Sequence, residues 1–171
     1  YSSIKNKKLF ITANKALIAK YGYDLHERIS KIGSAIYYEA AVAGAIPVIN
    51  SIKDGLVSDN IISIHAILNG TCNYILSDMT NNSKSFADAL IKAKELGFAE
   101  ADPTFDIEGI DSAHKLVILG LLAYGAKPNL DNVYIEGITS IKSEDIKYAD
   151  RLGYKIKLIC IASIDNNKLD F

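Results

Sequence analysis

The residues best suited to chemistry lie in one stretch, FAEADPTFDIEGIDSAHK, which spans residues 98–115. Asp111 and Lys115 are four residues apart, so on a helix they share one face and can pair. The run after Lys115, LVILGLLA, is apolar on every side and predicts a buried helix. A lysine at the mouth of such a helix is partly removed from water, which is one way to make a proton donor for a carbonyl group. On spacing alone, an Asp–Lys pair of this kind is more often an ordinary surface ion pair.

A second lysine follows a predicted strand near the start of the chain. The apolar run at 9–13 predicts a buried strand, and the helix formers after it make Asn14 a good N-cap. Open α/β sheets bind ligands outside the carboxyl ends of their strands, so Asn14 and Lys15 are candidates for a ligand site. The alternative is a solvated lysine in the first turn of a helix, since lysines are mostly exposed.

Two further segments have the character of binding sites. Residues 39–47, EAAVAGAIP, place the carboxylate of Glu39 among small residues that let backbone carbonyls converge. One carboxylate with several carbonyls suits a hard cation, whereas the alternative is a tight hinge in which Glu39 is only hydrogen-bonded. The turn at 69–71 leads into a predicted helix over 71–80, and Thr71 with neighbouring backbone amides, including that of Gly70, could hold an anion there.

Predicted strands and helices interleave along the chain, which indicates an α/β or α+β layered domain. The predicted strands span residues 9–13, 34–38, 61–68, 132–136 and 154–162. The predicted helices span residues 14–20, 23–31, 48–56, 71–80, 86–96 and 143–152, with one more after Pro103. No GxGxxG motif occurs, so only the last strands and helices of a dinucleotide-binding domain could lie in residues 1–42.

Composition excludes several classes of protein. The chain has 171 residues, of which 49% are hydrophobic and 23% charged, so it can bury a substantial core. A net charge of −1 without a long basic block argues against nucleic-acid binding, and no apolar run is long enough for a membrane span. Cys72 and Cys160 lack metal-ligand spacing and are expected to be reduced thiols of a cytoplasmic protein. Because the chain runs from Tyr1 to an abrupt Phe171, we expect a fragment.

Four blocks together resemble homoserine dehydrogenase, and their order and spacing match as well. They are ITANK at 11–15, YEAAV at 38–42, ILNGTCNYIL at 67–76 and the stretch from 96 to 115. The resemblance implies NAD(P)H-dependent interconversion of aspartate semialdehyde and homoserine, a step toward threonine, methionine and isoleucine. It also implies the end of a Rossmann-type nucleotide-binding domain at 1–42. A mixed-sheet substrate-binding domain with helices packed on the sheet follows at 43–171, incomplete at its C-terminus and forming a homodimer through that sheet.

The resemblance assigns roles to the candidate residues. Lys115 looks like the proton donor and acceptor at the substrate oxygen, and Lys15 like the lysine between cofactor and substrate, sometimes also given the acid–base part. Asn14 stands beside it on the cofactor side. Glu100 and Asp111 look like substrate-binding acids, which agrees with the ammonium group of an amino-acid substrate. Gly70 and Thr71 join them as substrate-binding residues.

The resemblance also implies a sodium site made by the Glu39 side chain with the carbonyls of Val42, Gly44 and Ile46. Two positions depart from the common pattern, because Phe98 stands where tyrosine is common and Cys72 where threonine is common. The first departure removes a hydroxyl group close to the predicted substrate site.

Two other functions are compatible with the sequence. One is a non-catalytic fragment that binds an amino acid or mediates dimerisation, since the phosphate-binding loop is missing; these residues alone are expected to be inactive. The other is a related two-domain dehydrogenase with a different substrate. Glu100 and Asp111 favour a substrate with an ammonium group, whereas a phosphorylated one calls for arginines, and Arg28 and Arg151 fall in no candidate site.

Overall fold

The computed structural model describes residues 2–125, 127, 129–165 and 168–171. The chain forms two compact units, each built from separate segments. The first unit combines residues 1–64, 114–133 and 161–171, and the second combines residues 65–113 and 134–160. Both contain helices, and the strands form one parallel and one largely antiparallel group, so the predicted mixed α/β class is confirmed.

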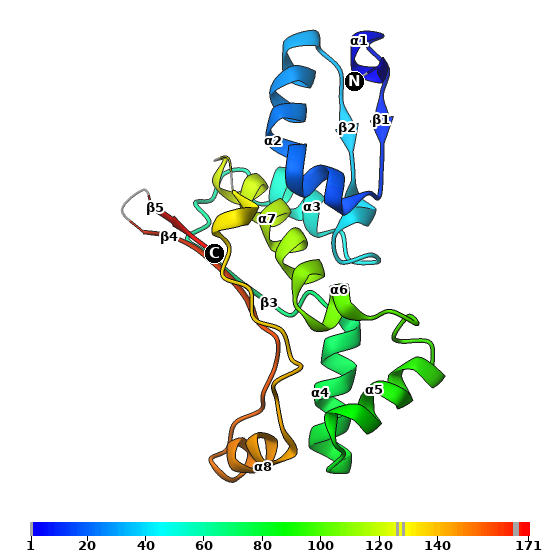
Figure 1. Ribbon diagram of the computed structural model, residues 1–171. Coiled ribbons are helices and arrows are strands. Elements are labelled where there is room, and N and C mark those ends of the chain that lie inside the picture. The colour runs from blue at the N-terminus through cyan, green and yellow to red at the C-terminus, as the bar shows by residue number, and fades with distance from the viewer. Residues whose placement is uncertain (1, 126, 128, 166–167) are drawn as a thin grey trace. The chain divides into compact units, whose positions relative to one another are not determined.

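The first unit begins with helix α1 (Ser2–Lys5), strand β1 (Phe10–Ile11), helix α2 (Lys15–Ile32) and strand β2 (Ile36–Tyr37). Strands β1 and β2 pair in parallel, and α2 runs beside them (Figure 1). The Asn14 side chain accepts a hydrogen bond from the Leu17 N–H, which confirms the predicted N-cap. The helix ends at Gly33, whose φ of 65° lies in the left-handed region that glycine adopts without strain.

The predicted helices at 14–20 and 23–31 are one continuous helix. Gly22 lies in its middle, and a Cβ there would approach the Leu121 side chain to 2.9 Å. Close packing against the later helix α7 (Ile110–Tyr124) therefore explains the glycine that lies between the two predicted helices.

The rest of the first unit contains short turns of helix. These are the 3₁₀ turn η1 (Glu39–Ala41), helix α3 (Val48–Asn50), the π turn η2 (Ser51–Gly55) and the 3₁₀ turn η3 (Leu130–Asn132). The predicted helix at 48–56 is present as α3 and η2 together. The predicted strand at 132–136 is wrong. The Asn129 side chain accepts the Asp131 N–H, and such a local hydrogen bond favours a turn over an extended strand.

The second unit is built on helices. Helix α4 (Gly70–Asn82) packs against α5 (Phe86–Glu95) and α8 (Ser143–Arg151), and the short helix α6 (Thr104–Ile107) lies at the start of α4 (Figure 1). The predicted helices at 71–80, 86–96 and 143–152 are present as α4, α5 and α8, whereas the helix expected after Pro103 is divided into α6 and α7. Their shared core consists mainly of Ile75, Leu76, Met79, Ala89, Ala93 and Ile146, all buried.

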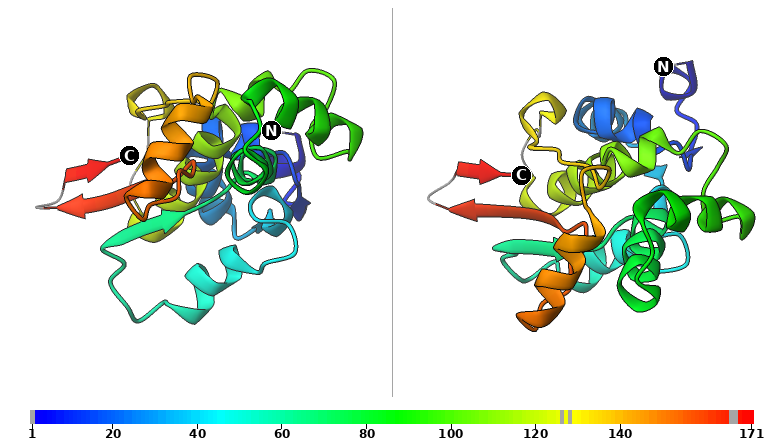
Figure 2. Two further views of the ribbon diagram at one scale, coloured as in Figure 1. Left: turned by 90° about the horizontal axis from the view of Figure 1, so that it is seen from below. Right: turned by 60° about the horizontal axis from the view of Figure 1, so that its bottom comes forward.

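Strands β3 (Ser63–Ala66), β4 (Cys160–Asp165) and β5 (Lys168–Asp170) form a sheet in that order. Strands β4 and β5 run antiparallel, as the two red arrows show (Figure 2). The predicted strand at 154–162 is correct only at its end. Lys155 pairs with Asp150 of α8, and Lys157 donates to Asn73 and Ser77 of α4, so this segment lies against helices rather than against a strand.

Candidate functional site

A buried amide at the start of α4 joins two carboxylates of the second unit. The Asn69 side chain is only 4% exposed, and its Oδ1 accepts the Cys72 N–H at 2.8 Å as the N-cap of α4. Its Nδ2 donates to Asp106 Oδ1 at 2.7 Å and to Asp111 Oδ2 at 3.0 Å. We call Asp106 and Asp111 the acid pair. One comes from α6 and the other from the first turn of α7, where the helix dipole favours negative charge.

Two neighbours on α4 complete the surroundings of the acid pair. Thr71 Oγ1 donates to the Phe98 carbonyl oxygen at 2.6 Å and lies 3.3 Å from Asp106 Oδ2. The Cys72 thiol donates to the Asp106 backbone oxygen at 3.2 Å. Burial, together with the nearby charges of Asp106 and Asp111, raises the pKa of the Cys72 thiol to about 12. Cys72 is therefore a neutral packing residue at the foot of the acid pair.

Glu100 lies in the loop between α5 and α6, with its side chain exposed. The loop backbone is held on both sides of it, because Thr71 binds the Phe98 carbonyl and Lys94 Nζ donates to the Ala101 carbonyl at 2.9 Å. Within the described contacts, no hydrogen bond joins Glu100 to Asp111. The structure thus places one predicted substrate-binding acid in a buried cluster and the other on a fixed, solvent-facing loop.

Phe98 occupies the same loop, and its ring stacks on Tyr74 with centroids 4.7 Å apart. Stacking of this kind stabilises an aromatic pair by about 0.5–1.5 kcal/mol beyond its buried area. The phenylalanine therefore anchors the loop to α4 without a side-chain hydroxyl.

Lys115 lies one turn after Asp111 on α7, in the first unit, and is half-buried. The four residues after it, Leu116 to Leu119, are all buried, so the predicted buried helix is confirmed. Helix α7 follows Gly109, which has a φ of 82° and where a Cβ would lie 3.2 Å from the Glu136 carbonyl oxygen. Glycine is thus required at the corner that sets the start of this helix.

Asn14 and Lys15 lie where the chain leaves β1 and enters α2. The Asn14 N–H donates to Thr12 Oγ1 at 3.0 Å, and its side chain caps the helix. Lys15 is half-buried, unlike the fully solvated lysine of the alternative interpretation. A lysine is therefore held at the carboxyl end of a strand, as the sequence predicts.

Residues 39–47, which we call the Glu39 loop, contain the predicted cation ligands. Glu39 Oε1 accepts the Ile49 N–H at 2.9 Å, and Oε2 accepts the Asn50 N–H at 3.0 Å. These are the hydrogen bonds that the hinge alternative expects, and they fix the carboxylate at the start of α3. Each carboxylate oxygen keeps a second lone pair, so the donor set remains compatible with a hard cation.

The backbone of the Glu39 loop also matters to whether the loop can hold a cation. Ala43 and Gly44 have φ values of 55° and 37°, so two successive residues lie in the left-handed region. The Ile46 carbonyl accepts the Val48 N–H at 2.8 Å, whereas among the described backbone hydrogen bonds none ends on the Val42 or Gly44 carbonyl. The described residues contain no cluster of three His, Cys, Asp or Glu side chains, so a cation site here depends on carbonyl oxygens.

Two residues of the acid cluster were missed by sequence reasoning. The sequence predicts Asn69 only as part of a turn before a helix that starts at Thr71, and Asp106 belongs to none of the predicted sites. Asn69 could have been found as an N-cap, as Asn14 was, but nothing in the sequence pairs it with acids 37 and 42 residues away.

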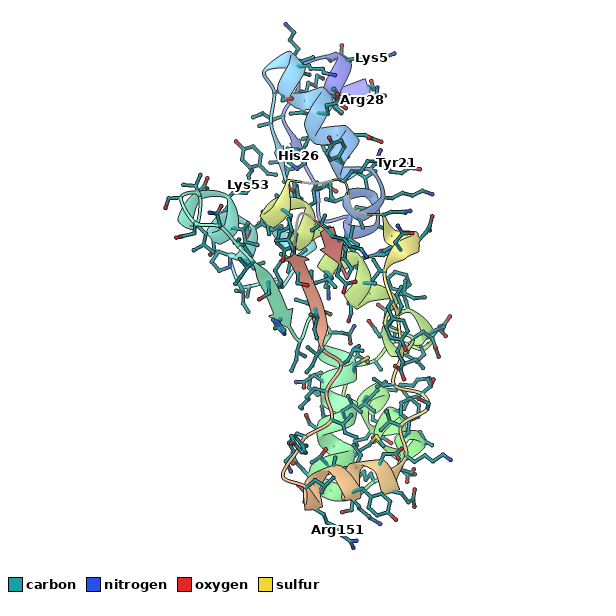
Figure 3. The ribbon with its side chains drawn as sticks, turned by 90° about the vertical axis from the view of Figure 1, so that its left-hand side faces the viewer. Lys5, Tyr21, His26, Arg28, Lys53 and Arg151 are labelled. Carbon is teal, nitrogen blue, oxygen red and sulfur yellow. The ribbon has the colours of Figure 1, made fainter. Side chains whose placement is uncertain are left out.

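The two arginines, the two cysteines and the helix lengths were also subjects of prediction. Arg28 lies on α2 and Arg151 at the end of α8 (Figure 3). Neither residue is part of the acid pair or the Glu39 loop. Neither Cys72 nor Cys160 forms a disulfide. Within the described residues, no helix has the length and apolar character needed to cross a membrane.

A buried carboxylate that shares an amide with a second, half-buried acid, in a mixed α/β fold, is typical of an enzyme that binds a small polar substrate. Comparison with known proteins makes this class specific. The sequence model of the homoserine dehydrogenase family matches residues 47–170. The chain therefore belongs to the homoserine dehydrogenase family.

Relatives cover nearly all of this chain. It is 49% identical over 157 residues to the homoserine dehydrogenase of Neisseria gonorrhoeae, covering 92% of this chain and 36% of that protein. The crystal structure of a homoserine dehydrogenase from Thiobacillus denitrificans matches with a TM-score of 0.93 at 47% identity, covering 97% of this chain and 38% of that one. A hyperthermophilic archaeal homoserine dehydrogenase in complex with NADPH matches with a TM-score of 0.81 at 29% identity, covering 98% and 48%. The chain thus spans less than half the length of these relatives.

Proposed function

We propose that this chain is the substrate-holding part of a homoserine dehydrogenase that reduces L-aspartate 4-semialdehyde to L-homoserine with NADPH or NADH, reversibly. This reaction is a step toward threonine, methionine and isoleucine. The observation that carries the proposal is the buried, hydrogen-bonded carboxylate of Asp111, one helical turn before Lys115 in a chain of this family.

The acids would bind the amino group of the substrate. A buried carboxylate is a strong partner for an ammonium ion, because the pair interacts in a low-dielectric site. Asp111 supplies a fixed carboxylate, and Glu100 supplies a second one on a loop whose backbone is held. The alternative substrate class, phosphorylated compounds, lacks support because neither arginine belongs to this cluster.

The start of α4 would bind the substrate carboxylate. Its first backbone N–H groups, at Gly70 and Thr71, carry the positive end of the helix dipole. A Cβ at Gly70 would meet no atom within 4 Å, so packing does not require glycine there. Close approach of a ligand to the backbone would explain it.

Lys115 would act at the reacting oxygen. The nicotinamide cofactor, when bound, supplies the hydride that adds to the aldehyde carbon. A lysine ammonium beside the carbonyl oxygen stabilises the negative charge that develops there and then donates its proton. Lys15, held at the end of β1 with Asn14, is the second candidate for the acid–base role and the residue on the cofactor side.

Residues 1–42 would be the end of the cofactor-binding domain and residues 43–171 the substrate domain. A parallel strand pair connected through a helix, as in β1–α2–β2, is the unit from which dinucleotide-binding domains are built. The NADPH complex of a structural relative supports a nicotinamide cofactor.

The Glu39 loop would hold a structural sodium ion through the Glu39 side chain and the carbonyls of Val42, Gly44 and Ile46. Support comes from the fixed carboxylate and from two successive residues of the same loop in the left-handed region. Replacing sodium by choline at constant ionic strength should lower the melting temperature of the full-length protein, and Glu39→Gln should abolish that difference. Equal melting temperatures in both salts would exclude the site.

The substrate-domain sheet would form a homodimer interface. Ile62 beside β3 and Ile161 on β4 are 71% and 48% exposed, and exposed apolar side chains on a sheet are typical of an interface. Ile161→Lys in the full-length protein should shift its mass in solution toward the monomer. An unchanged mass would place the interface elsewhere.

The proposed function is tested with the full-length parent protein, homoserine and each nicotinamide cofactor in turn. Turnover with at least one cofactor is expected. If homoserine binds but no cofactor is reduced, the non-catalytic alternative is correct, and if homoserine does not bind, the substrate assignment is wrong.

A further inference from the structure

We propose that Asn69 is a positioning residue, which holds the acid pair together and fixes the direction in which Asp111 presents its carboxylate to the substrate. This inference rests on the proposed function, because it assigns Asp111 to the substrate ammonium. Asn69 itself would act through the two acids.

Both ends of the Asn69 amide form hydrogen bonds within the cluster. Its oxygen accepts the Cys72 N–H, and its two N–H groups point at Asp106 Oδ1 and Asp111 Oδ2. The opposite orientation would place the amide nitrogen against the Cys72 N–H and the amide oxygen against two carboxylates. The helix cap therefore determines which end of the amide faces the acids.

The bridge also has an electrostatic role. Both acidic oxygens lie within 3.0 Å of one nitrogen, so the buried carboxylate of Asp111 and the half-buried carboxylate of Asp106 are held close together. The Thr71 hydroxyl beside the Asp106 carboxylate is neutral. A shared N–H donor offsets part of the repulsion and keeps both carboxylates turned toward one point, which prepares them for a cation.

The capping role and the bridging role can be separated, because serine and aspartate both cap helices but lack the amide N–H groups. Asn69→Ser keeps a neutral cap and removes both bridging donors. Asn69→Asp keeps the cap and the size of the side chain but adds a third negative charge. Ser85→Ala is the matched control, since Ser85 caps α5 in the same unit and has no contact with the acid pair.

The experiment measures steady-state kinetics of homoserine oxidation by the full-length protein and its variants. Losing hydrogen bonds to a charged group costs about 1.5–3 kcal/mol, so Asn69→Ser should raise the KM for homoserine by about 10-fold to 100-fold. The KM for the cofactor should change less than about twofold. Asn69→Asp should have the larger effect, because its charge repels the acids. Ser85→Ala should lower the melting temperature and leave both KM values unchanged.

A double-mutant cycle supplies a readout that a merely structural role would not move. If Asn69 acts through Asp106 and Asp111, Asn69→Ser should cost clearly less in an Asp106→Asn background than in the wild type. Additive effects would mean that Asn69 acts independently of Asp106 and would overturn the bridge.

The remaining outcomes are also decisive. If wild-type protein turns over homoserine but both Asn69 variants change only the melting temperature, Asn69 is only a cap. The same conclusion follows if neither variant folds while Ser85→Ala does. If the wild type shows no homoserine turnover, the proposed function fails and this inference fails with it.

Discussion

Two acidic regions of the molecule hold their carboxylates with different donors. In the Glu39 loop, both oxygens of one carboxylate accept backbone N–H groups only 10 and 11 residues away. In the acid pair, two carboxylates share one side-chain amide that is 37 and 42 residues away. The first arrangement closes a local turn, whereas the second brings together the starts of three helices.

The difference shows what each region can do. A carboxylate that satisfies two backbone N–H groups is part of the backbone structure, and its removal leaves both N–H groups without that acceptor. A carboxylate that is held by a side chain can be replaced without removing the acceptor of a backbone N–H group. Changes in the Glu39 loop should therefore appear mainly in stability, and changes near the acid pair mainly in kinetics.

The largest effect on the kinetic side is expected at Lys115. Lys115→Ala in the full-length protein should lower kcat by about 10²–10⁴, the usual contribution of a positioned acid or base, while the protein stays folded. Steady-state assays of cofactor reduction with homoserine would measure this change in kcat. Lys127→Ala is the control, because this exposed lysine pairs with Asp24 in the first unit and should turn over normally. Near-normal turnover in Lys115→Ala would remove Lys115 from the mechanism.

A smaller kinetic effect is expected at the acid pair itself. Asp111→Asn keeps the shape of the side chain but removes the charge that would bind the substrate ammonium. Losing a charge-assisted hydrogen bond costs about 1.5–3 kcal/mol, so kcat/KM for homoserine should fall by about 10-fold to 100-fold. Asp150→Asn, at the exposed ion pair with Lys155, should leave kcat/KM unchanged. Equal kcat/KM values for Asp111→Asn and wild type would show that another group binds the amine.

The Glu39 loop should respond in stability. Glu39→Ala removes the acceptors of the Ile49 and Asn50 N–H groups, which should lower the free energy of unfolding by about 1–3 kcal/mol. Glu39→Gln keeps one acceptor and should lose less. Urea unfolding of the full-length protein measures both. If Glu39→Ala loses turnover but no stability, the contrast between the two regions is wrong.

In both regions the sequence predicts individual acidic residues, but it does not predict which distant residues they contact. Asp111 and Lys115 could be chosen because their spacing on a helix is regular, and Glu39 because it is the single acid among small residues. Asn69 and Asp106 could not be paired, since their contact depends on how α4 and α6 pack.

In the fold, too, local features were predictable and long-range pairing was not. Capped helices were predictable, because Asn14 and Ser85 bind N–H groups three residues ahead. The strand expected at 132–136 was wrong, and only the end of the one expected at 154–162 is a strand. Alternating and β-branched residues there lie beside helices or turns, and a strand exists only where another strand pairs with it.

A last long-range pair provides the smallest expected effect and links α2 to the Glu39 loop. His26 Nε2 lies 2.7 Å from the hydroxyl of Tyr38, the residue before Glu39. Burial lowers the pKa of His26 below its ordinary 6.5, and the positive charge of Lys53 lowers it further (Figure 3). Burial raises the pKa of Tyr38, as does the charge of Glu39, so the hydroxyl stays neutral.

Because the pKa of His26 is lower in the folded state, the unfolded state binds a proton first as the pH falls below 6.5. The stability that neutral His26 contributes is therefore complete above 6.5 and is lost as the pH falls toward the folded pKa. Urea unfolding of the full-length protein from about pH 8 to about pH 5 should show this loss, and His26→Gln should reduce it. His65→Gln, at an exposed position on β3, should leave the pH dependence unchanged. A wild-type profile identical to that of His26→Gln would mean that the link between α2 and the Glu39 loop does not depend on the charge of His26.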